Sequence, residues 1–146
     1  MYVSIVIPIL NEKQYIAKCI DSVLSQDYPV ESCEILLVDG GSTDGTREII
    51  LQYIQRYKNI KMLDNPKRIA PSAMNIGITN ANGDLIVIMG AHANYASDYI
   101  SKCVKWSQTT GAENVGGPAF ARGEGFWGKA IEYAHYSRFG LGGADF

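Results

Sequence analysis

The sequence predicts an α/β fold: a doubly wound, mostly parallel sheet with helices on both faces. Short runs rich in Val and Ile alternate with longer segments whose apolar residues recur at helical spacing. Each longer segment can form the crossover helix that parallel strands require, and such crossovers are almost always right-handed. Glycine or polar residues follow three of the apolar runs directly, at the strand ends where ligands bind in these sheets.

The first half of the chain predicts two strands, each followed by a helix. Val3–Ile9 is the first apolar run, and a helix from about Lys13 to Asp27 follows it. The second strand is predicted over 34–38, and its exit, DGGSTDGT, offers glycines for a turn and polar side chains for a helix N-cap. The apolar positions are Tyr15, Ile16, Cys19, Ile20, Val23 and Leu24 in the first helix and Ile49, Ile50, Tyr53, Ile54 and Tyr57 in the second.

The second half continues the alternation. A third strand is predicted over 60–63, a third helix ends at the turn Asn82-Gly83, and a strand over 85–89 follows. Because this last run is continuously apolar, we expect it to be buried on both faces. A helix over 98–110, a short strand at Val115-Gly116 and a helix over 127–136 are also expected, whereas GGPAFARGEGFWG is too rich in glycine for regular structure.

Composition excludes several classes of function. The net charge of −2 gives no bulk attraction to nucleic acid, and no apolar run approaches the roughly 20 residues of a membrane span. The amino terminus lacks the basic segment and cleavage site of a signal peptide. The three cysteines are far apart in the sequence, which is typical of reduced thiols in a cytosolic protein and does not indicate a disulfide framework. A zinc site needs clustered ligands, and these cysteines and the two histidines do not supply them.

The predicted strand exits place three candidate segments, 8–12, 39–44 and 90–92, at one edge of the sheet. If the strand order is 3-2-1-4, strands one and four flank the point where the order reverses, and the segments meet in one crevice. Asp39 either accepts a hydrogen bond from a ligand or caps the turn that follows it. The loop GGSTDG does not match the dinucleotide-binding pattern G-x-G-x-x-G, so hydride transfer is disfavoured.

Four segments in register carry a resemblance to a known family. VSIVIPILNE, ILLVDGGSTDGT, NPKRIAPSAMNIGI and GDLIVIMGAHANY resemble the nucleotide-binding half of a family 2 inverting glycosyltransferase, and are most similar to succinoglycan-type exopolysaccharide glycosyltransferases. The resemblance covers nearly the whole chain and implies a truncated GT-A fold. Residues 1–146 would be the nucleotide-sugar-binding part, without the acceptor-side portion.

The resemblance also implies an activity. The protein would move a sugar from a nucleotide-diphosphate sugar, most simply a UDP-sugar, to a saccharide or lipid-linked acceptor with inversion, in extracellular polysaccharide or cell-envelope synthesis. It would be a hexosyltransferase-type enzyme located in the cytoplasm, at the inner face of the membrane for a full-length protein. The family's acidic pair that supplies the general base is not among these 146 residues, so no catalytic residue is assigned, and we expect this chain alone to be inactive.

Roles in nucleotide binding follow from the resemblance. Asp39 would accept a hydrogen bond from the imide N–H of a uracil, or from the corresponding edge of another base. Arg68 would meet the nucleotide or its phosphates, although without the resemblance it could equally be an exposed surface charge. Asn75 and Gly77 match the family pattern A-x-N-x-G. The remaining residues expected at the nucleotide, which line the base and ribose pocket, shape its loop or end the fourth strand, are Pro8, Ile9, Asn11, Glu12, Ser42, Asp44, Gly90 and Ala91.

The fourth strand departs from the family. It ends in Gly90-Ala91-His92, where the family has D-x-D or D-x-H, so only His92 remains as a ligand for a divalent metal, Mn²⁺ or Mg²⁺. An imidazole suits Mn²⁺ better than Mg²⁺, although a histidine in this position can also be structural. The missing carboxylate leaves two alternatives to an active enzyme: an inactive nucleotide-binding module and a purely structural or oligomerising domain.

Overall fold

The computed structural model describes residues 1–117, 122–123 and 125–137, which fall into two units, 1–113 and 114–146. The first unit holds one sheet of four parallel strands in the order β3-β2-β1-β4. These strands are β1 (Val3–Ile9), β2 (Cys33–Asp39), β3 (Ile60–Asp64) and β4 (Leu85–Ile88). The predicted α/β class and the order 3-2-1-4 are therefore confirmed, and the order reverses between β1 and β4.

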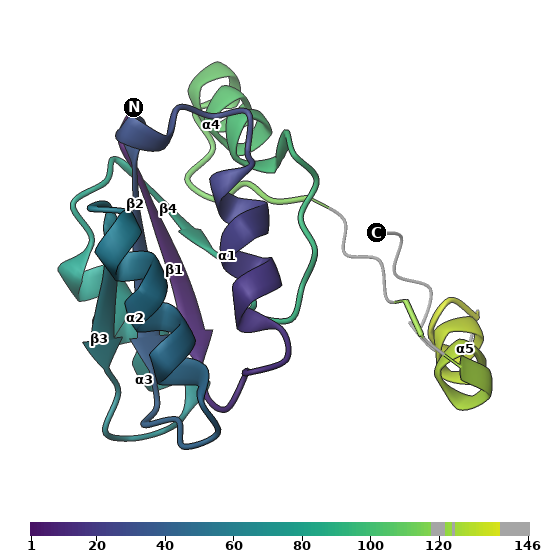
Figure 1. Cartoon of the computed structure of the whole chain (residues 1–146). Helices are drawn as coiled ribbons and strands as arrows, with labels where there is room; N and C mark the ends of the chain where they lie inside the picture. Colours follow the sequence, from purple (N-terminus) through teal and green to yellow (C-terminus); the bar gives the residue numbers. More distant parts are fainter. Residues whose placement is uncertain (118–121, 124, 138–146) are drawn as a thin grey trace. The chain divides into compact units, whose positions relative to one another are not determined.

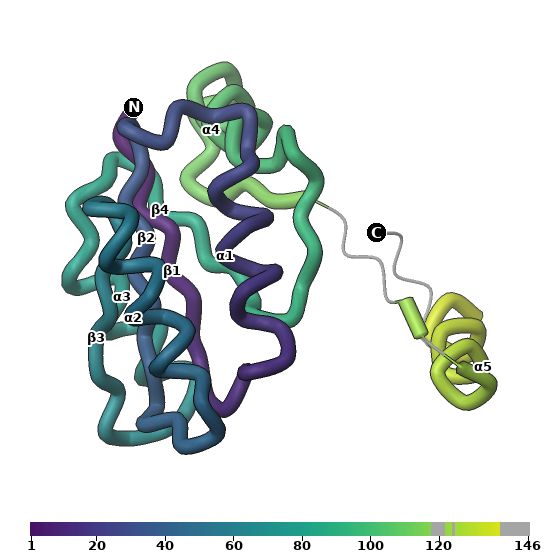
Figure 2. Tube along the Cα trace, in the orientation of Figure 1, coloured from purple at the N-terminus to yellow at the C-terminus, as the bar shows by residue number. Residues whose placement is uncertain are grey.

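Helices cover both faces of this sheet, as Figures 1 and 2 show. The helices α1 (Ile16–Leu24) and α2 (Thr46–Arg56) lie on one face, and α3 (Ala70–Asn80) lies on the other. A short 3-10 turn, η1 (Val30–Ser32), precedes β2, and α4 (Tyr99–Thr110) follows β4 through a long loop. None of the helices in the described part of the chain is both long and apolar enough to cross a membrane.

Alternating residues of the central strands build the two halves of the core. Ile5 of β1 lies beside Ile35 of β2 and packs toward α1 and α2, whereas Val6 lies beside Leu36 and packs toward Ala73 of α3. Successive residues of a strand point to opposite faces, and all of these residues are fully buried. This double burial explains why both strands read as continuous apolar runs.

The expectation that the fourth strand is buried on both faces is wrong. Val87 is buried, but Ile86 and Ile88 on the opposite face remain 37% and 42% exposed. β4 pairs only with β1 among the described strands, and α3 packs against β1 and β2 rather than over β4. An apolar run therefore does not distinguish an edge strand from a central one.

A buried carboxylate ties the strands together at their amino ends. Glu34 accepts hydrogen bonds from the Ser4 hydroxyl (2.7 Å), the Asn82 backbone N–H (2.7 Å) and the Lys61 ammonium (3.1 Å). Burial raises the pKa of Glu34, but these hydrogen bonds together outweigh it, so the pKa lies below its ordinary value. This cluster joins β1, β2, β3 and the turn before β4.

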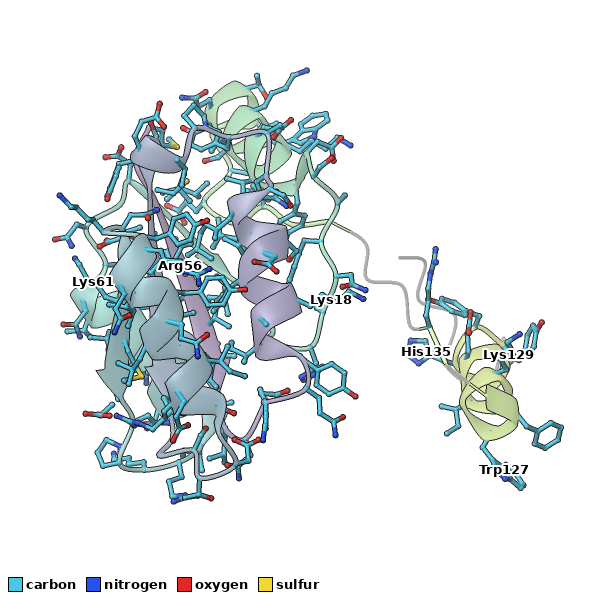
Figure 3. All side chains as sticks on the ribbon, viewed as in Figure 1. Lys18, Arg56, Lys61, Trp127, Lys129 and His135 are labelled. Carbon is cyan, nitrogen blue, oxygen red and sulfur yellow. The ribbon has the colours of Figure 1, made fainter. Side chains whose placement is uncertain are left out.

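The second unit contains α5 (Gly125–His135), and two expectations fail there. Val115 and Gly116 form no strand, and the helix begins two residues earlier than predicted, inside the glycine-rich segment. A glycine lowers the stability of a helix by only about 1 kcal/mol relative to alanine, so Gly125 and Gly128 do not prevent the first turn of α5 from forming. Residues 118–121 and 124 of that segment lie outside the described residues. Trp127 extends away from α5 and is largely exposed (Figure 3).

Candidate functional site: a cleft at the switch point

A cleft of about 340 Å³ opens at the carboxyl ends of β1 and β4, where the strand order reverses. Three stretches of chain line it: the end of β1, the loop from β3 into the first turns of α3, and the end of β4. The lining residues are Pro8, Ile9, Leu10, Glu12, Asn65, Arg68, Ile69, Ala70, Ala73, Met74, Ile88, Met89, Gly90, Ala91 and His92. Most of this lining is apolar, with a few polar or charged side chains among it.

The predicted site residues fall into three groups. Asn11, Asp39, Ser42 and Asp44 lie beside the cleft, in the loops after β1 and β2, but do not line it. Asn75 is exposed on α3 and is not a lining residue. Those that do line the cleft are Pro8, Ile9, Glu12, Arg68, Gly90, Ala91 and His92.

Asp39 is fully buried at the end of β2, and both of its carboxylate oxygens are occupied. It accepts hydrogen bonds from the backbone N–H groups of Gly41 and Ser42 (both 3.0 Å) and from the Ser42 hydroxyl (2.5 Å). The guanidinium of Arg47 completes the set at 2.7 Å and also bridges to Asp64. Asp39 therefore caps its own loop, and a direct contact with a nucleobase stays a prediction.

The loops after β1 and β2 are held together by short polar contacts. The backbone N–H of Asn11 donates to the Ser42 hydroxyl (2.8 Å), and the Asn11 side chain accepts a hydrogen bond from the Thr43 backbone (3.0 Å). The backbone N–H of Lys13 donates to Asp44 (3.1 Å). The hydroxyl of Thr46 donates to Asp44 and lowers the pKa of that carboxyl. The expected meeting of these two segments is thus observed.

Backbone strain concentrates beside the cleft. Asn11 and Arg68 have φ values of 55° and 57°, and no other non-glycine residue in the described ranges has a positive φ. Left-handed backbone costs most residues about 1–2 kcal/mol and is often found at functional sites. The Arg68 side chain lies over Gly41, where a Cβ in place of the glycine hydrogen would meet its Nη1 at 3.6 Å. Arg68 thus bridges the β3–α3 loop and the loop that Asp39 caps.

The segment after β4 brings His92 next to Glu12 in the loop after β1. His92 Nδ1 lies 3.3 Å from Glu12 Oε1, and the preceding Gly90 is held by a hydrogen bond from its N–H to the Tyr95 hydroxyl (2.6 Å). Burial raises the pKa of Tyr95, so this hydroxyl stays protonated. One imidazole and one carboxylate are suitable donors for Mn²⁺. The described residues contain no cluster of three or more side chains that could hold a metal without a ligand's help.

Several lining residues carry no distinguishing signal in the sequence. Leu10, Ile69, Ala73, Met74 and Met89 have the character of ordinary apolar residues of helices, strands or loops. Asn65 does carry a signal, because an Asn-Pro step directly after a predicted strand places a polar side chain at the same sheet edge as the other candidates.

Comparison with known proteins agrees with this architecture. The family model "Glycosyl transferase family 2" matches residues 4–142. Succinoglycan biosynthesis protein ExoA of Rhizobium meliloti (strain 1021) is 35% identical over 142 residues, 96% of this chain and 43% of that protein. A dolichyl N-acetyl-alpha-D-glucosaminyl phosphate 3-beta-D-2,3-diacetamido-2,3-dideoxy-beta-D-glucuronosyltransferase of Methanococcus voltae is 45% identical over 109 residues, 73% of this chain and 34% of that protein.

Solved structures share the fold. Mannosyltransferase PcManGT from Pyrobaculum calidifontis, in complex with GDP-Man and Mn²⁺, superposes with a TM-score of 0.67 and 29% identity over 72% of this chain and 32% of its own. S. aureus TarS 1-349 in complex with UDP-GlcNAc gives 0.68 and 20% identity over 85% of this chain and 39% of its own. The chain thus spans less than half the length of these relatives. It has the parallel α/β architecture of a partial GT-A domain and belongs to glycosyl transferase family 2.

Proposed function

We propose that this chain is the donor-binding part of a glycosyltransferase that uses a nucleotide-diphosphate sugar, with a UDP-sugar as the first candidate. The observation that carries the proposal is the cleft at the switch point between β1 and β4. Its volume of about 340 Å³ falls in the range of roughly 300–1,000 Å³ that is usual for small-molecule sites.

The lining divides the cleft by chemistry. Ile9, Leu10 and Ile69 offer apolar surface for a base and ribose, with Pro8 beside them. Arg68 supplies a guanidinium whose geometry suits phosphate oxygens. The loops after β1 and β2, which carry Asn11, Asp39, Ser42 and Asp44, would hold this wall in place, and Gly90 and Ala91 would border the ribose and diphosphate. Asn75 would support the site from α3.

A divalent metal fits the donors present. His92 and Glu12 place one nitrogen and one oxygen 3.3 Å apart at the edge of the cleft, and a diphosphate would supply further oxygens. A bound metal would neutralise charge on the diphosphate, and His92 would hold it on the protein. The presence of Mn²⁺ together with GDP-Man in the PcManGT complex supports this choice of ion.

The whole protein would transfer the sugar with inversion to a saccharide or lipid-linked acceptor in exopolysaccharide or cell-envelope synthesis, at the inner face of the membrane. The names of the ExoA and glucuronosyltransferase relatives support this class of reaction. A second candidate is an inactive nucleotide-binding module, favoured by Gly90 at the position where the family pattern has a carboxylate.

A ligand screen tests the proposal. UDP-, GDP-, dTDP- and CDP-sugars, each with and without Mn²⁺, should include at least one that raises the thermal unfolding temperature, because ligands that bind only the native state stabilise it. Arg68→Ala should remove the shift, whereas Lys58→Ala should retain it, because Lys58 is an exposed cation before the amino end of β3 and the cleft lies at the carboxyl ends of the strands. No shift with any of these ligands would contradict nucleotide binding. Sugar transfer by the full-length protein would exclude the inactive module.

A further inference from the structure

The helix α5 carries an exposed apolar face. At 3.6 residues per turn, six of its eleven residues fall within an arc of about 160° around the helix axis. These residues are Phe126, Trp127, Ala130, Ile131, Tyr133 and Ala134. None of the described α5 residues is buried, and the four large apolar or aromatic side chains of the arc are 70–79% exposed. A contiguous apolar face of this kind marks an interaction surface.

The other side of α5 is polar. Lys129 and His135 border the apolar arc, one on each side, and Glu132 lies opposite its centre. Glu132 Oε2 accepts a hydrogen bond from the backbone N–H of Gly123 at 2.9 Å, so this carboxylate is tied to the segment before the helix. Trp127 and Lys129 leave α5 on different sides (Figure 3). The apolar arc is therefore bordered by a cation and an imidazole, and the carboxylate of the helix is held away from it.

The charge around α5 differs in sign from that of the whole chain. Residues 122–138 include three cations and two carboxylates, whereas the whole chain has a net charge of −2. The cations are Arg122, Lys129 and Arg138, and the carboxylates are Glu124 and Glu132. Exposed aromatic side chains beside cations are complementary to an anionic lipid surface, because the rings suit the headgroup level and the cations attract the phosphates.

The length of α5 decides how it can meet a bilayer. Its eleven residues span about 16 Å, roughly half of the 30 Å hydrocarbon core, so the helix is too short to cross. We propose that α5 is an interfacial helix that lies in the plane of an anionic membrane, with Phe126, Trp127 and Ile131 at the boundary between headgroups and acyl chains. The inference rests on the proposed function for the membrane location and adds the element that makes the contact.

Tryptophan fluorescence with lipid vesicles tests this contact directly, because the chain has only two tryptophans, Trp106 and Trp127. In Trp106→Phe, vesicles of equal parts phosphatidylglycerol and phosphatidylcholine should shift the emission of Trp127 to shorter wavelength, and lipids brominated on the acyl chain should quench it. In Trp127→Phe, the remaining Trp106 of α4, which is 58% exposed, should show neither change. Vesicles of phosphatidylcholine alone, or added salt, should weaken the effect.

Co-sedimentation with the same anionic vesicles measures what the apolar face contributes. Ile131→Glu should lower the partition coefficient at least about tenfold, because it removes an apolar side chain from the interface and brings a carboxylate against anionic lipid. Leu51→Glu makes the same kind of change at an exposed leucine of α2 and should bind like the wild type. Both substitutions are at exposed positions, so neither should prevent folding.

Three results would overturn the proposal: no binding of the wild type to anionic vesicles, equal partition of Ile131→Glu and Leu51→Glu, or binding without a change in Trp127 emission. A wild type that is dimeric in gel filtration, and monomeric as Ile131→Glu, would assign the face to a second copy instead. A thermal shift with a nucleotide sugar should persist in Ile131→Glu, because the lining residues of the cleft all belong to the first unit. Failure at the membrane and failure of nucleotide binding are therefore separate results.

Discussion

Asp39 is the residue whose removal should disturb the site most. Its carboxylate is buried and receives four donors, one of them the Arg47 guanidinium. Asp39→Ala would leave those donors unpaired, so we expect the free energy of unfolding to fall by about 3 kcal/mol. Asp64→Ala removes the exposed partner of the same arginine and should cost no more than about 0.5 kcal/mol. Urea denaturation measures both; equal losses would show that Asp39 does not organise the loop.

Gly90 tests whether the departure from the family pattern weakens metal binding. Its φ is not positive, and a Cβ there would meet only Ala93 Cβ and the Tyr95 hydroxyl, both at 3.9 Å. Gly90→Asp should therefore fold normally and strengthen the mutual enhancement of UDP and Mn²⁺ binding by about tenfold. His92→Ala should weaken that enhancement. Calorimetric titration with UDP, with and without Mn²⁺, measures this enhancement in each variant. An enhancement equal to that of the wild type in both variants would show that the metal does not bind at the end of β4.

Glu34 should make stability depend on pH. Because its pKa is lower in the folded protein, its stabilising contribution is present above the ordinary value of 4.5 and disappears as the pH falls through the folded value. The free energy of unfolding of the wild type should exceed that of Glu34→Gln by about 1–2 kcal/mol near neutral pH, and this difference should shrink as the pH falls. Glu113→Gln, an exposed control, should follow the wild-type profile. A difference that stays constant with pH would contradict the assignment to the carboxylate.

At the scale of elements, α3 can approach the sheet closely only because Gly77 has no side chain. A Cβ at Gly77 would come within 2.2 Å of Val6 Cγ1 in β1. Gly77→Ala should therefore destabilise the protein by about 1–3 kcal/mol, although alanine favours helices. Gly116→Ala, with open space around it, should be nearly neutral. Thermal unfolding of the two variants decides; a stabilised Gly77→Ala would mean that α3 does not pack here as described.

The elements also show how far a sequence pattern reaches. Apolar runs and helical spacings locate β1 to β4 and α1 to α4, because periodicity reports which face is buried. They cannot show that β4 lies at the edge of the sheet that the described residues form, since Ile86 and Ile88 have the same apolar character as the buried Val87. Tertiary packing decides which strands α3 covers, and it covers β1 and β2. The start of α5 was not predicted correctly, because glycine lowers helix propensity without forbidding a helix.

For the whole molecule, strand order does most to predict the site. The switch-point rule places the ends of β1 and β4 in one crevice, and both line the cleft. The rule also brings in the loop after β2, which lies beside the cleft and supports it through the Asn11–Ser42 contact. The β3–α3 loop also lines the cleft, and the family resemblance already assigns Arg68 of this loop to the nucleotide, whereas Asn65 carries only the weaker signal of an Asn-Pro step after a strand.

The central claim is that a nucleotide binds in this cleft, and backbone amide NMR of the labelled chain during titration with UDP or GDP tests it most directly. Shifts should concentrate in residues 9–12, 65–70 and 88–92, which surround the cleft. Residues 30–34 and 82–84, at the opposite ends of the strands near the Glu34 cluster, should hardly move. Shifts centred on the Glu34 cluster, or none at millimolar UDP and GDP, would contradict the claim.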